Sequence, residues 1–207
     1  MRIWQMSLML LALFCIVACD QRKGTFIDTR DGKKYKTVII GRQIWMAENL
    51  NYAVEGSKCY ENDSGNCKKY GRLYDWEKAM EVCPKFWHLP SDEEWKTLVV
   101  FAGGNEIAGK KLKAKNEWKQ PDEWEQLVVK DEYNGIDEFG FSALPGGAGI
   151  SGVRFGGAGY YGFWWSSRAS ESNSYRAYRI YMDYGSKLAN WDFNDKRLFL
   201  NVRCLQY

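Results

Sequence analysis

The order of hydrophobic and polar positions predicts strands at both ends of the chain and helices between them. Short β-prone runs lie between residues 25 and 51, and Asp31-Gly32 between two of them is a strong hairpin signal. Residues 73–82 have apolar side chains at helical spacing, and Pro84 stops the run. From Phe139 onward the pattern changes to short strands separated by glycine turns, expected at 140–144, 152–158, 163–167, 175–182 and 198–205.

A capping box predicts the start of a second helix. Ser91 is followed three residues later by Glu94, so the serine hydroxyl and the glutamate can each reach a free backbone amide. This helix then extends to Gly103-Gly104, with its apolar positions facing the core. Strands, then helices, then strands indicate an α+β fold with an antiparallel sheet. A third helix is expected over 106–113, a polar loop over 52–70 and a charged surface excursion over 114–134.

Residues 1–18 have the pattern of a targeting segment rather than of a part of the fold. Arg2 supplies a positive charge, and Met6–Ala18 is almost wholly apolar, as in an export signal. The run is too short for a membrane-spanning helix, which needs about 20 apolar residues. Residues 19–24 then form a short polar tether, and residues 25–207 are long enough to bury the core of a single domain.

The end of the targeting segment resembles the bacterial lipoprotein signal. Its box of aliphatic, small, small, Cys is filled by Ile16, Val17, Ala18 and Cys19. The resemblance implies cleavage before Cys19 and lipidation of its sulfur and its amine, which together give a stable membrane anchor. The alternative is an ordinary secretory signal followed by an unmodified cysteine.

Four cysteines remain beside Cys19 once the signal is removed, and an even number in an exported protein predicts disulfides. They allow three pairings, of which we favour Cys59–Cys67 and Cys83–Cys204. The first pair brackets a turn-rich loop that closes easily on itself, and the second would tie the first helical region to the final strand. A zinc site is a poor alternative, because the chain has no Cys-x-x-Cys and a single histidine.

Composition and charge limit the partners. Ten Trp and thirteen Tyr, with twenty Gly against four Pro, suit short strands and tight turns. The 29 basic and 26 acidic residues give a formal net charge of +3, far from the basic stripe of a nucleic-acid-binding protein. We therefore expect no nucleic-acid partner.

Ordered motifs along the chain resemble the bacterial family called the Fibrobacter succinogenes major paralogous domain. The resemblance extends from about Asp28 to the C-terminus, and Phe86, where the family usually has glycine, is a small departure. The motifs are Trp45–Leu50, Tyr70–Trp76, Cys83–Asp92, Gly140–Gly147, Trp165–Ser167 and Val202–Cys204.

The resemblance implies a C-type-lectin-like fold, with two main helices, a twisted antiparallel sheet and many loops. A disulfide from the first helix to the last strand recurs in that fold, which supports Cys83–Cys204. The related formylglycine-generating enzymes need a reactive cysteine pair in their C-terminal half, whereas this chain has only Cys204 after residue 83. The resemblance therefore implies a fold and leaves the function open.

The glycine- and aromatic-rich stretch 146–165 is the main candidate for binding. Its glycines lack the Walker spacing of a phosphate-binding loop. Its functional signal is therefore its aromatic side chains, which can stack on sugar rings or on a protein partner. Strand alternation leads us to expect a buried Trp165 and a partly exposed Trp164. For each single residue, core packing is an equal alternative. The candidate ligand-binding residues are Tyr160, Tyr161, Trp164, Arg179, Tyr184 and Trp191.

Metal and catalytic signals are weaker. Asp131, Asp137 and Glu138 are candidate ligands of a structural calcium ion, with a solvated charged loop as the favoured alternative. The tripeptide Gln120-Pro121-Asp122 matches the sugar-specifying motif of calcium-dependent lectins, but the acidic strand that should follow it closely is missing. His88 is the only histidine, and we expect it to be structural; the serines have no partners spaced as in a triad.

These observations rank three functions. The first is a non-catalytic protein of the bacterial cell envelope, lipid-anchored and facing the periplasm or cell surface, whose domain binds a glycan or protein. The second is a structural or adhesion protein without a small ligand, and the third is an enzyme. We expect no cofactor beyond the calcium candidate. An exposed aromatic patch around Tyr160–Trp164 and Trp191 would favour the first function, and burial of these rings the second.

Overall fold

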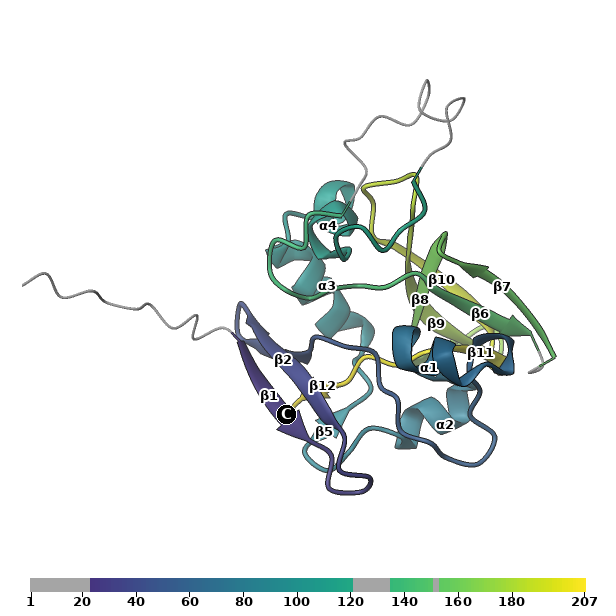
Figure 1. Ribbon diagram of the computed structural model, residues 1–207. Helices are drawn as coiled ribbons and strands as arrows, with labels where there is room; N and C mark the ends of the chain where they lie inside the picture. The colour runs from purple at the N-terminus through teal and green to yellow at the C-terminus, as the bar shows by residue number, and fades with distance from the viewer. Residues whose placement is uncertain (1–22, 121–134, 151–152) are drawn as a thin grey trace, which may run out of the picture.

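The strands at the two ends of the domain meet in one small sheet. The computed structural model describes residues 23–120, 135–150 and 153–207, and the first sheet has the order β1-β2-β3-β12-β5 with every pair antiparallel. The C-terminal strand β12 therefore lies between β3 and β5 (Figure 1). The strands are β1 (Lys23–Ile27), β2 (Lys34–Ile40), β3 (Gln43–Met46), β5 (Trp87–His88) and β12 (Leu205–Gln206).

The remaining strands form a second, larger sheet of order β10-β9-β8-β11-β6-β7, with β4 paired to β11. Its pairs are antiparallel except those of β8 with β11 and β6, which are parallel. The α+β class is confirmed, but the strands divide between two sheets instead of forming the single antiparallel sheet expected. The strands are β4 (Leu73–Tyr74), β6 (Gly146–Ile150), β7 (Arg154–Ala158), β8 (Tyr161–Ala169), β9 (Arg176–Asp183), β10 (Asn190–Asp195) and β11 (Leu198–Asn201).

Two of the helices confirm expectations. Helix α3 (Asp92–Phe101) begins at the predicted capping box, where Ser91 Oγ accepts from the Glu94 amide and the Ser91 amide donates to Glu94 Oε2 at 2.8 Å. Helix α4 (Asn105–Leu112) lies where the third helix was expected.

The other two helices differ from the predicted pattern. Residues 73–74 form β4, and α2 (Trp76–Glu81) begins only after Asp75, whose carboxylate accepts from the Lys78 amide. Helix α1 (Ser64–Tyr70) lies inside the expected polar loop. Its sequence has no apolar periodicity, and a 3-10 turn (Tyr60–Asn62) precedes it. The described residues thus hold more helices than the two main ones predicted.

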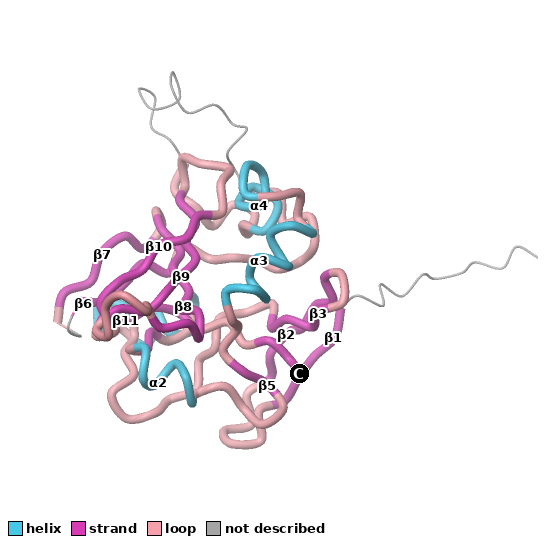
Figure 2. The backbone as a smooth tube through the Cα atoms, turned by 180° about the vertical axis from the view of Figure 1, so that it is seen from behind, coloured by secondary structure: helices cyan, strands magenta, loops and turns pink. Residues whose placement is uncertain are grey.

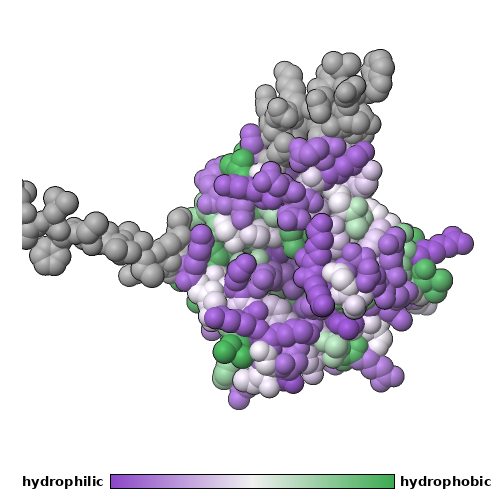
Figure 3. Space-filling view, viewed as in Figure 1, coloured by the Kyte–Doolittle hydropathy of each residue, from purple (hydrophilic) through white to green (hydrophobic). Residues whose placement is uncertain are grey.

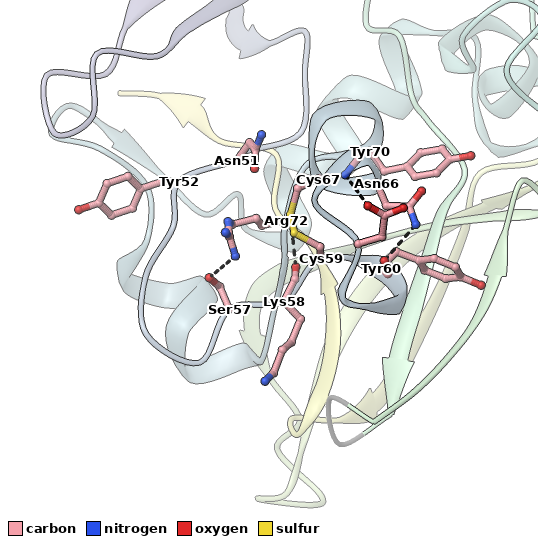
Figure 4. Close-up of a disulfide and its surroundings, with 12 residues drawn as sticks. Asn51, Tyr52, Ser57, Lys58, Cys59, Tyr60, Asn66, Cys67, Tyr70 and Arg72 are labelled. Carbon is pink, nitrogen blue, oxygen red and sulfur yellow. Dashed lines mark hydrogen bonds between the residues drawn. A yellow bond between two sulfur atoms is a disulfide. The ribbon is translucent and has the colours of Figure 1, made fainter.

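Both predicted disulfides are present, Cys59–Cys67 and Cys83–Cys204. The first closes the 3-10 turn onto α1, and Figure 4 shows it beside the Arg72–Ser57 hydrogen bond. The second joins the segment after α2 to the residue just before β12. The first link stabilises local structure that weak helix propensity would not hold alone, and the second joins residues 121 apart in the sequence.

Helix α3 packs between the two sheets, which lie on either side of it in Figure 2. The rings of Trp45 and Trp95 are 4.7 Å apart, and Phe141 meets Trp45 edge-on at 5.6 Å. A second cluster, which includes Trp76 and Trp165, fills the space between α2 and the larger sheet. No helix among residues 23–120, 135–150 and 153–207 is long and apolar enough to cross a membrane.

Several of the sequence motifs meet at a buried polar cluster, which we call the Asn49–Arg203 hub. Asn49 Oδ1 accepts from Arg203 Nη2 and from Trp164 Nε1, both at 2.8 Å, and its amide donates to the Tyr70 carbonyl. Arg203 also donates to the carbonyls of Met46 and of the 141–142 segment. Burial lowers the pKa of Arg203 to about 9, so the guanidinium stays charged at neutral pH.

Candidate binding site

The structure does not bring the six predicted ligand-binding residues together. Trp164 is fully buried, so the expected partial exposure is wrong. Strand β8 is covered on both faces, with Trp164 packed in the α3 cluster and Trp165 in the α2 cluster. Alternation along a strand exposes every second residue only where one face of the sheet is open, and here it is not.

Two of the six, Tyr161 and Arg179, join a row of rings on β8 and β9 that we call the aromatic ladder. The Tyr161 and Phe163 rings stack with centroids 5.6 Å apart, and Phe163 meets Tyr181 at 6.0 Å. Arg179 lies over Phe163 at 4.3 Å and pairs with Asp192 at 3.1 Å. Within the ladder the ring faces pack against one another and against Arg179, so few ring faces remain open to stack on a sugar.

The other three predicted residues lie elsewhere. Tyr160 and Tyr184 meet edge-on at 5.3 Å, with Lys119 4.7 Å above the Tyr160 ring. Trp191 packs against the core cluster that holds Trp164. The glycine–aromatic stretch thus contributes mainly to packing.

A hollow of about 560 Å³ lies between the start of α2, the start of β9 and the β10–β11 turn. We call it the α2 hollow. Its size falls in the range of small-ligand sites. Its lining includes an exposed aromatic residue, Tyr175, and six charged residues, which are Asp75, Glu77, Lys78, Asp195, Lys196 and Arg197.

Tyr175 offers a free ring on a fixed backbone. Its amide donates to Asn173 Oδ1 at 3.0 Å, and its carbonyl accepts from the Lys196 amide at 2.9 Å. The residue is 78% exposed, and its ring contacts no other ring or cation within the part of the chain that the structure describes. An aromatic face held in this way can stack against an apolar surface of a ligand.

The charges of the α2 hollow balance, with three acidic and three basic side chains. Hydrogen bonds from Arg197 lower the pKa of Asp195 to about 2, so this carboxylate stays ionised. Lys196 lies 4.2 Å above the Trp76 ring and 3.8 Å from Glu77. A balanced set of donors and acceptors fits a neutral polar ligand better than an anion or a cation.

The calcium candidates are not gathered. The Asp137 carboxylate accepts from the amide and the hydroxyl of Ser142, and Glu138 pairs with Lys111 at 3.2 Å. Asp131 and Asp122 lie outside the described residues. Within the described ranges there is no group of three or more His, Cys, Asp or Glu that could hold a metal ion.

His88 has a structural environment. Its Nε2 lies 2.8 Å from Glu94 Oε1, and its ring stacks on Tyr207 at 4.3 Å. Glu94 is the same residue that closes the α3 capping box. The histidine therefore links the start of α3 to the C-terminus.

Sequence reasoning missed the α2 hollow. Tyr175 counted only as the start of the strand expected at 175–182, and Asp195 lies outside every expected strand. The available signal was the polar run Asn194–Arg197, which is typical of a turn. Nothing in the spacing of residues 75, 175 and 195 indicates that they meet.

The comparisons with known proteins identify one family. The model of the Fibrobacter succinogenes major domain matches residues 38–206. No curated protein and no solved structure matched the chain.

Proposed function

The chain belongs to the Fibrobacter succinogenes major domain family, and from this premise and the geometry of the α2 hollow we propose that its domain is a non-catalytic module that binds a neutral glycan. The observation that carries the proposal is the free ring of Tyr175 at a hollow whose charges balance. A sugar offers an apolar face of C–H groups to a ring, and hydroxyls that both donate and accept hydrogen bonds. Carboxylates accept from those hydroxyls, and ammonium and guanidinium groups donate to them.

The state of the acids argues against glycoside hydrolysis in this hollow. Such chemistry needs one carboxyl group whose pKa is raised so that it can donate a proton. The pKa of Asp195 is lowered instead. Asp75 is engaged as the N-cap of α2. Glu77, the third acid, pairs with Lys196 at 3.8 Å. The three acids therefore suit binding.

The cellular setting is part of the proposal. The lipoprotein box at Cys19 supports a protein held in the bacterial cell envelope by its own lipid, with the domain facing the periplasm or cell surface. A C-type-lectin-like fold is consistent with the disulfide from the region after α2 to the residue before β12.

A glycan array tests the binding proposal on a soluble form that begins after Cys19. Tyr175→Ala should reduce the signal of any glycan that binds, because the stacking surface is lost, while the thermal midpoint changes little. Tyr160→Ala is the matched control, since it removes a tyrosine of the sequence-predicted loops. If Tyr160→Ala lost binding and Tyr175→Ala kept it, the α2 hollow would be disproved as the binding site, and the glycine- and aromatic-rich stretch 146–165 would be the site instead.

A protein partner is the second candidate function. The aromatic ladder favours it, because rings that stack on one another present their edges and hydroxyls as a flat surface. Tyrosine and arginine are enriched in such interfaces.

A further inference from the structure

Two hydrophobic side chains at the end of α3 remain exposed. Val100 is 73% exposed and Phe101 52%. Core-facing positions of α3 are Trp95, Leu98 and Val99, so Val100 and Phe101 belong to a different face of the helix. The rest of the exposed face is polar, with Glu93, Lys96 and Thr97, so only the last turn of α3 carries an apolar surface that core packing does not explain.

Contacts connect this patch to Lys23, the first described residue. Phe101 meets the Phe139 ring at 5.5 Å, and a Cβ placed on Gly41 would lie 3.0 Å from the Phe101 ring. A Cβ placed on Gly140, next to Phe139, would lie 3.4 Å from Lys23 Cε. The patch therefore borders the place where the chain enters the domain.

The length of chain before Lys23 limits how far that place can lie from a lipid on Cys19. Lys23 is the fourth residue after Cys19, and four extended residues span at most about 14 Å. A compact domain of this length has a radius of gyration of about 16 Å, so a span of about 14 Å keeps the entry side of an anchored domain close to the lipid surface.

Three basic residues lie near the patch, of which Lys111 already pairs with Glu138 at 3.2 Å. Arg42 follows Gly41 and is exposed, and Lys96 precedes Val100 by one helical turn. Lys111 lies 5.8 Å from the Phe139 ring. Basic side chains beside a membrane surface are attracted by anionic headgroups.

We propose that Val100 and Phe101 form a membrane-docking patch that inserts into the headgroup region of the membrane holding the lipid of Cys19. The inference rests on the proposed lipid anchor. None of the residues that line the α2 hollow belongs to this patch, so in this orientation the hollow stays open to a ligand (Figure 1 shows α2 and α3).

The test uses the full lipidated chain in vesicles of phosphatidylcholine and phosphatidylglycerol. The native cysteines described here are in disulfides, so Val100→Cys can be labelled with an environment-sensitive nitrobenzoxadiazole dye. We expect blue-shifted emission and several-fold weaker quenching by aqueous iodide than for the same dye at Tyr175→Cys, the control near the α2 hollow. Equal quenching at the two positions would overturn the docking patch.

The anchor is checked separately by mass spectrometry of the N-terminal peptide, with Cys19→Ala as the control that should lose the lipid. A lipidated protein whose dye at residue 100 is freely quenched disproves docking and leaves the anchor standing. A protein without lipid on Cys19 disproves the anchor, and the docking patch with it. The glycan array is independent of both outcomes.

Discussion

At the scale of single residues, the motifs of this family hold the fold together. Asn49, Tyr70, Trp164 and Arg203 come from four separated stretches and meet in one buried hydrogen-bond network. A buried charge is tolerated only when its hydrogen bonds are made. The motifs are therefore explained by structure, and the residues of the proposed ligand site lie mostly outside them.

Replacing Asn49 with alanine tests the hub. The change removes the acceptor shared by Trp164 Nε1 and Arg203, which leaves these two buried donors less well satisfied and should cost about 1.5–3 kcal/mol. Urea unfolding followed by fluorescence measures the loss. Asn51→Ala, at a half-buried neighbour outside the hub, is the control. A loss for Asn49→Ala no larger than for the control would contradict this role.

The unsuccessful residue predictions have a common physical reason. Trp164 looked exposed because a strand pattern does not reveal that both faces of β8 are covered. Tyr175 and Asp195 lie close to Asp75 only because the β10–β11 turn packs beside α2. Such long-range neighbours depend on tertiary packing, which local pattern does not encode.

At the scale of elements, signals that act within a few residues were the reliable ones. The capping box at Ser91 and the Asp31-Gly32 turn needed only local chemistry, and both lie where the sequence indicated. Helix α1 was missed because it depends on the Asp63 cap and on the Cys59–Cys67 bond more than on an apolar face. Strand β6, with its glycines, was missed for lack of side-chain pattern.

Lys113 connects two elements and makes stability depend on pH. It follows α4, it is fully buried, and its Nζ donates to the carbonyls of Asp183 and Ser186 in the β9–β10 loop. Burial lowers its pKa from 10.5 to about 8. Between these two values the unfolded chain binds the proton and the folded chain does not, so the contribution of Lys113 to stability rises with pH across this window.

Urea unfolding at a series of pH values from 7 to 10.5 measures this linkage. Other groups also titrate there, so the informative quantity is the difference between the natural protein and Lys113→Met. We expect the natural protein to gain stability relative to the variant as pH rises above about 8. A difference that is constant with pH would show that Lys113 keeps its proton on folding.

At the scale of the whole molecule, the two disulfides act over very different lengths. Cys83 and Cys204 are 121 residues apart, and Cys59 and Cys67 only 8. On the chain-entropy estimate, the long link should contribute about 5 kcal/mol and the short one about 2.5 kcal/mol.

Paired serine variants test this difference. Cys83→Ser with Cys204→Ser should lower the midpoint of urea unfolding more than Cys59→Ser with Cys67→Ser, because it frees a much longer loop in the unfolded chain. Both variants keep an even number of cysteines in the domain, which avoids stray thiols. A larger loss from the short pair would mean that local strain in the 3-10 turn and α1 matters more than chain entropy.

The position of β12 sets the order of events in biosynthesis. A ribosome makes the chain from the N-terminus, yet the first sheet closes only when the last strand enters between β3 and β5. The Cys83–Cys204 disulfide likewise cannot form until Cys204 has been synthesised. Nearly complete chains therefore stay open until their final residues emerge. Removal of only the last few residues should leave a chain that never closes.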